Sequence, residues 1–183
     1  MLGTAESAVT IAMAPILREA TEAMRASLHS ATCNRSSAHQ FGRKAGEALE
    51  DARETLARLL DADAEEVLFT SGATEANNLA LQGVVGKHQA AVTPPVVIVT
   101  ATEHSSVSET AKVLEARGAC RLKVAPVKRS GEVDADALLA LVDADTALVC
   151  VMHANNETGA VNPVRDLAAR VKEKNPAAHV HVD

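Results

Sequence analysis

Residues 96–127 read VVIVTATEHSSVSETAKVLEARGACRLKVAPV, and this stretch decides the fold class. Strand-like runs at 96–100 and 121–127 flank the segment 105–117, whose apolar residues recur at helical spacing. Gly118 directly follows that segment and marks the expected end of the helix. A strand, a crossover helix and a second strand in this order predict a parallel βαβ unit.

Strand-like and helix-like segments alternate along the rest of the chain as well. The strand-like runs are mostly apolar throughout, as expected where helices cover both faces of a sheet. Further strands are predicted at 67–70, at 147–152 and around Val180, and further helices at 13–28, 39–60, 74–85, 134–142 and 164–174. The pattern predicts an α/β fold with a mostly parallel sheet and helices on both faces.

The composition argues against several classes of function. The net charge is −6 and the charges are interspersed, whereas a nucleic-acid-binding surface needs a basic patch. Two Phe with no Trp or Tyr leave almost no platform for base stacking. No apolar run is long enough to span a bilayer and no signal-peptide pattern opens the chain. We therefore expect a cytoplasmic protein with neither nucleic-acid nor membrane partners.

The three cysteines, Cys33, Cys120 and Cys150, are widely spaced and form no CxxC pair. This spacing indicates neither a zinc site nor a disulfide framework. We expect reduced, partly buried thiols, because free cysteine usually packs as a small hydrophobic residue.

The first strand end with unusual residues is FTSGATE at 69–75, where a predicted strand runs through small residues into a helix start. Ligands of open α/β sheets bind outside the carboxyl ends of the strands, and a helix start attracts phosphate. Gly72 and Ala73 permit close backbone approach, and Thr74 adds a hydroxyl donor. From spacing alone, an ordinary helix cap by Ser71 or Thr74 is the more common explanation.

Two further strand ends carry polar groups. His104 follows the strand at 96–100, where it could equally be a helix cap or a satisfied polar group. HANNETG at 153–159 leaves the strand at 147–152, and a plain loop does not readily explain His, two Asn and Glu in succession. Both segments are expected at the same sheet edge as the turn at 70–74.

Asp183 ends the last predicted strand, where a carboxylate can face a cationic nitrogen of a ligand. An alternative is a metal site, because His179, His181 and Asp183 alternate and so share one face of a strand. Such a histidine pair is a weak signal, and chance histidines on a partly exposed strand are more common.

Several strings match one enzyme family in both letters and order. They are SSAHQFGR at 36–43, FTSGATEANNL at 69–79, Glu103 with His104, MHANNETG at 152–159 and HVD at 181–183. From about Asn34 onward the chain resembles the cysteine desulfurase and selenocysteine lyase family, within the class V aminotransferase-like enzymes that use pyridoxal 5'-phosphate (PLP). The resemblance implies part of the large domain of a fold-type I PLP-dependent transferase.

The resemblance also implies roles for individual residues. Ala73 and Thr74 match positions that bind the PLP phosphate, and Asn155 matches the side chain near the phenolic oxygen of the ring. Asp183 matches the carboxylate that pairs with the ring nitrogen. His104 matches the imidazole that stacks on the ring and assists proton transfer, which makes it the candidate catalytic residue. No residue is assigned to a metal.

The activity that the resemblance implies is removal of sulfur or selenium from L-cysteine or L-selenocysteine, with alanine as the other product, by a homodimer. Sulfur supply for iron–sulfur cluster assembly is one use of this chemistry. The sequence does not choose between sulfur and selenium. Two alternatives are an inactive fragment that acts only through dimerisation and another class V PLP enzyme.

The match has departures. Residues 7–15 do not clearly match the family's opening segment, and Arg35 stands where the family usually has Pro. We expect 1–33 to form an N-terminal helical segment and 34–183 an incomplete PLP-binding large domain without the second domain. The family's cofactor-binding lysine and sulfur-accepting cysteine lie beyond Asp183, so we expect the chain as given to be inactive alone.

Overall fold

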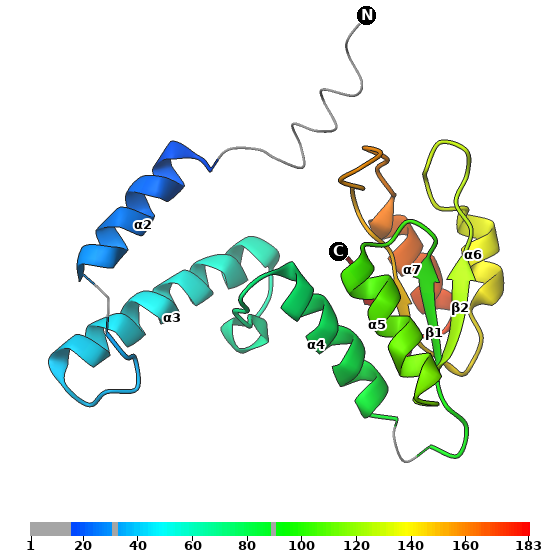
Figure 1. Cartoon of the computed structure of the whole chain (residues 1–183), viewed down its shortest axis with the longest axis horizontal. Helices are drawn as coiled ribbons and strands as arrows, with labels where there is room; N and C mark the ends of the chain where they lie inside the picture. Colours follow the sequence, from blue (N-terminus) through cyan, green and yellow to red (C-terminus); the bar gives the residue numbers. More distant parts are fainter. Residues whose placement is uncertain (1–15, 31–32, 89–90) are drawn as a thin grey trace, which may run out of the picture. The chain divides into compact units, whose positions relative to one another are not determined.

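The computed structural model describes residues 16–30, 33–88 and 91–183 (Figure 1). The chain divides into two compact units, which comprise 16–69 and 70–183 within these described residues. The start of the first predicted helix, residues 13–15, lies outside the described residues.

The larger unit contains a four-stranded sheet. Its strands are β1 (Val96–Thr100), β2 (Arg121–Ala125), β3 (Thr146–Cys150) and β4 (His179–His181), and their spatial order is β2-β1-β3-β4. Every pairing is parallel, which confirms the predicted sheet. Because the strands are parallel, all four carboxyl ends lie at one edge, and His104, Asn155 and Asp183 follow three of these ends.

Helices cover both faces of this sheet, as predicted (Figure 1). Helices α6 (Ala135–Leu141) and α7 (Val164–Lys174) pack on one face. Helices α4 (Ala73–Gly86) and α5 (Ser105–Ala116) pack on the other. Each face therefore has its own hydrophobic core.

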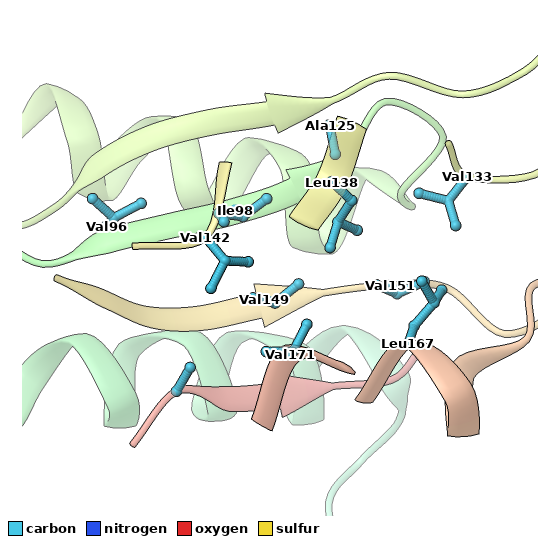
Figure 2. Close-up of a cluster of buried hydrophobic side chains, with 11 residues drawn as sticks. Val96, Ile98, Ala125, Val133, Leu138, Val142, Val149, Val151, Leu167 and Val171 are labelled. Atoms are coloured by element: carbon cyan, nitrogen blue, oxygen red, sulfur yellow. The ribbon is translucent and has the colours of Figure 1, made fainter. Parts of the chain in front are cut away.

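Successive side chains of a central strand point to opposite faces of the sheet, and helices cover both faces, which explains why these strand sequences are continuously apolar. Figure 2 shows Val96 and Ile98 of β1 in the cluster that also contains Leu138 of α6 and Val171 of α7. Their neighbours on β1, among them Val97, belong to the opposite cluster with residues of α4 and α5. A strand buried on both faces needs an apolar side chain at every position.

The helix boundaries follow the predicted signals. His104 is the N-cap of α5, and Gly118 adopts a φ of 70° just after that helix ends. The Asp134 side chain caps α6 by accepting a hydrogen bond from the Ala137 N–H at 3.1 Å. A left-handed φ suits glycine because it has no Cβ, so Gly118 ends the helix without strain.

One predicted strand does not form, and the boundaries of two others are shifted. Residues 67–70 form no strand, since among the described residues no neighbouring strand pairs with them. Strand β2 ends at Ala125 rather than at 127, because Pro126 has no N–H for the ladder. Strand β3 covers Thr146–Cys150 instead of 147–152, and the Met152 N–H donates to the Glu103 side chain instead of a backbone carbonyl.

The smaller unit consists of helices α2 (Arg18–Ser30) and α3 (Gln40–Leu60) and the short 3-10 helix η1 (Ala64–Glu66). Both predicted helices form within the described residues. Segment 67–69 follows η1, and the Arg53 guanidinium holds it by donating to the Val67 carbonyl and lying 5.1 Å from the centre of the Phe69 ring. Side-chain contacts thus replace the predicted sheet pairing there. In the described part of the chain, no helix is long and apolar enough to cross a membrane.

Candidate functional site

The turn at 70–74 leads directly into α4, and its N-cap is Gly72. Gly72 has no side chain to cap the helix, and a Cβ added there would meet no atom within 4 Å. The explanation of this motif as an ordinary Ser71 or Thr74 cap is therefore wrong. Ala73 and Thr74 are exposed in the first turn, where helix N–H groups lack intrahelical acceptors. This helix start can accept an anionic group.

Ser71 has a different task from capping. Its backbone N–H and its hydroxyl both donate to the Glu75 carboxylate, at 2.7 and 2.5 Å. These two hydrogen bonds lower the pKa of Glu75, which is therefore ionised at neutral pH. The carboxylate is thereby tied to the backbone of the turn.

His104 is exposed, and one side of its ring is fixed. Its Nδ1 accepts from the Ser106 N–H at 3.1 Å and lies 2.8 Å from the Ser106 hydroxyl oxygen. Within the described residues, its Nε2 has no hydrogen-bond partner. The arrangement orients the imidazole and leaves Nε2 for a ligand.

Glu103 links two strand ends, a role that sequence reasoning missed. Its Oε1 accepts from the Thr100 hydroxyl at 2.5 Å and from the Met152 N–H at 2.7 Å. Its Oε2 is buried and has no partner in the described part of the chain. Burial raises the pKa of Glu103, and the charge of Asp183 adds to that rise. The one signal available was a carboxylate directly after an apolar strand.

Asn155 is buried and organises the loop after β3. Its Oδ1 accepts from the N–H groups of Glu157 and Thr158 at 3.0 and 2.8 Å. Its Nδ2 donates to the Thr102 carbonyl at 3.0 Å and contacts the Met152 sulfur at 3.5 Å. Since thioether sulfur is a weak acceptor, one amide N–H of Asn155 can still serve an oxygen of a ligand.

Asp183 follows β4 and is half-buried. Its backbone carbonyl accepts from the His153 N–H at 2.9 Å, so the ends of β4 and β3 are joined. Its negative charge contributes to a raised pKa of the buried Cys150 thiol, for which burial is the larger cause. A cationic group of a ligand would relieve the repulsion between Asp183 and Glu103.

The alternative of a metal site at His179, His181 and Asp183 gains no support. Among the described residues, no group of three or more His, Cys, Asp or Glu is placed to hold a metal ion. His179 is exposed, while the His181 Nε2 lies 2.8 Å from the Asn77 Oδ1. The His181 ring thus pairs with the Asn77 side chain of α4 rather than with a metal-ligand group.

Hydrogen bonds join the elements that carry the predicted motifs. Asn77 on α4 contacts both Ser106 on α5 and His181 on β4. Glu103 after β1 contacts Met152 after β3. These bonds link α4, which follows the turn at 70–74, to the start of α5 next to His104 and to β4 next to Asp183, and they link the segments after β1 and β3.

Comparison with known proteins decides the family. The family model described as aminotransferase class-V matches residues 8–183. The chain belongs to this family. Membership accounts for the parallel sheet with helices on both faces.

Several relatives of this class V chain are similar over most of its length. It is 39% identical over 168 residues to the cysteine desulfurase IscS of Dictyoglomus turgidum, a match covering 88% of the chain and 40% of that relative. It is 35% identical over 196 residues to the selenocysteine lyase of Bos taurus, covering 94% and 45%. A solved NifS-like protein superposes with a TM-score of 0.85 at 38% identity, covering 92% and 45%. The chain thus spans less than half the length of these relatives.

Proposed function

We propose that the protein carrying this chain removes sulfur or selenium from L-cysteine or L-selenocysteine, with PLP as cofactor and alanine as the other product. The proposal is supported by membership of the class V family together with an uncapped helix start, an oriented His104 and the Asp183 carboxylate, on elements that hydrogen bonds link. Relatives named for each reaction are similar to the chain, so both substrates stay in the proposal. We expect the protein to work as a homodimer.

The residues of the edge fit the polar groups of PLP. The N–H groups of Ala73 and Thr74 suit a phosphate, because a helix start carries a partial positive charge. Asp183 suits the protonated ring nitrogen, and Asn155 has an N–H for the phenolic oxygen. His104 is exposed and its ring can stack on a flat ligand. The assignment of residues 34–183 to a PLP-binding large domain stays a prediction.

The residues of this chain would bind and orient. PLP supplies an electron sink for bond breaking at the substrate. Asp183 would keep the ring nitrogen protonated, which strengthens that sink. The Glu103 bridge would hold the segment before His104 at a constant distance from the Asn155 loop. Pre-set geometry of this kind lowers the entropic cost of reaching the transition state.

The test joins residues 1–183 to the part of the Dictyoglomus turgidum relative that follows the matched region. Alanine release from L-cysteine and from L-selenocysteine is recorded with PLP present, and residues 1–183 alone serve as the background. We expect alanine above background from at least one substrate. Asp183→Asn should lower the rate about tenfold, the equivalent of ~1.4 kcal/mol. A folded, PLP-binding polypeptide that releases no alanine from either substrate would contradict the proposed reaction.

A further inference from the structure

Four side chains of the larger unit form a row of hydrogen bonds that begins at His181 and ends at His104. The His181 Nε2 lies 2.8 Å from the Asn77 Oδ1, and the Asn77 Nδ2 lies 2.9 Å from the Ser106 Oγ. The Ser106 Oγ lies 2.8 Å from the His104 Nδ1. Asn77 and Ser106 are only 3% and 7% exposed, so water competes little for these bonds.

The backbone sets the direction of this row. The Ser106 N–H points to the His104 Nδ1 at 3.1 Å, and a backbone N–H can only donate. Nδ1 must therefore carry a lone pair, and the proton of a neutral His104 ring is on Nε2. With Nδ1 an acceptor, the Ser106 hydroxyl at 2.8 Å also donates to it.

The remaining directions follow in turn. Since the Ser106 hydroxyl gives its proton to His104, its oxygen accepts from the Asn77 amide N–H. The other end of the Asn77 amide is then its oxygen, which faces His181 and requires a proton on Nε2 of that ring. Burial lowers the pKa of His181, while the charge of Asp183 partly opposes this, so the ring is neutral at neutral pH. All four groups have a defined donor or acceptor role.

We propose that Asn77 and Ser106, anchored by His181, are positioning residues that hold His104 as the tautomer with its proton on Nε2. His104 then offers a hydrogen-bond donor to a ligand at the sheet edge and cannot act as a base through that nitrogen. The ligand atom facing it is an acceptor, such as the carboxylate or the ionised thiol or selenol of an amino acid. This role at a reaction site rests on the proposed function, whereas the tautomer does not.

The experiment is ¹⁵N NMR of the imidazole rings in the full chain without PLP, so it is independent of the alanine assay. His104→Gln and His181→Gln assign the two rings. We expect Nδ1 of His104 to resonate as a pyridine-type nitrogen shifted by accepted hydrogen bonds, and Nε2 as a pyrrole-type nitrogen. Nε2 of His181 should also be pyrrole-type. A pyrrole-type Nδ1 in His104, or a pyridine-type Nε2 in His181, would overturn the proposal.

Matched variants test whether the row itself sets the state of His104. Ser106→Ala removes the hydroxyl donor, and its control Ser108→Ala removes a hydroxyl that bonds the His104 carbonyl instead of the ring. Asn77→Asp replaces the amide donor by an acceptor, so that the Ser106 hydroxyl turns away from His104. Its control is Asn78→Asp, on the same helix but outside the row.

We expect the His104 Nδ1 resonance to move toward the value of an unbonded pyridine-type nitrogen in both Ser106→Ala and Asn77→Asp. It should stay in place in the two controls. Circular dichroism of each variant verifies that the helices remain. Equal shifts in test and control variants would refute a role for Asn77 and Ser106, and the wild-type spectrum decides the tautomer even if a variant fails to fold.

Discussion

The two units of the chain use apolar residues in opposite ways. In the larger unit, Ile98 and Leu138 are fully buried between sheet and helices. In the smaller unit, Phe41 is 64% exposed and Leu59 is 77% exposed, although both lie on a strongly amphipathic helix. Helical periodicity is thus enough to form α3, but among the described residues of that helix the buried ones are the small Gly42, Ala45 and Ala57, and its large apolar side chains stay mostly exposed.

The side-chain hydrogen bonds of the two units also differ, in how far apart in the sequence their partners lie. The carboxyl edge of the larger unit ties together residues far apart in sequence, as in the pair His181 and Asn77. The side-chain hydrogen bonds of α3 are mostly local, for example Arg53 to Glu50 at 3.0 Å. Local pairs on a helix surface contribute little to stability. The larger unit is therefore expected to dominate the stability of the chain.

The largest expected effect comes from emptying the core. Ile98→Ala should cost about 2–4 kcal/mol of unfolding free energy, because it leaves a cavity between β1 and the helices. Leu59→Ala, the matched change in the smaller unit, should cost less than about 0.5 kcal/mol. Urea titration followed by circular dichroism measures both. Equal costs would mean that α3 is buried in solution.

The rate at which the cysteine thiols react should also differ between the two units. Cys33 is exposed in the smaller unit, whereas Cys120 and Cys150 are buried in the larger one. Burial raises the pKa of Cys120 to about 11, so at a given pH its thiolate is roughly a hundredfold scarcer than that of an ordinary thiol. We expect one fast and two slow thiols with a thiol-specific reagent in native protein. Three fast thiols would show that the larger unit opens readily.

A smaller effect concerns Glu103 and pH. Its pKa is raised in the folded state, so its contribution to stability is present at low pH and is lost as pH rises through the folded pKa. Glu103→Gln cannot titrate at this position, so the unfolding free energy of the variant relative to that of wild type should be higher at pH 8 than at pH 5. Glu65→Gln, the same change at an exposed position of the smaller unit, is the control. A pH-independent effect of Glu103→Gln would argue against the raised pKa.

Much of the site could be predicted because strand ends are local features. The apolar run at 96–100 and the polar residues after it are adjacent in the sequence, so a parallel sheet brings His104 to the edge that carries Asn155 and Asp183. The resemblance added the roles of those residues. Residues 67–70 misled because an apolar run specifies a strand only when another strand completes its hydrogen bonds.

The sequence by itself determined the helices of both units, the parallel order of strands and crossovers, and the family. These depend on backbone hydrogen bonds and on the spacing of apolar side chains over short distances. Only the tertiary structure decided that Glu103 bridges to Met152 and that Ser106 and His181 meet at Asn77, 29 and 104 residues away. Such contacts depend on where crossovers bring strand ends and helix starts together, and no local pattern encodes that position.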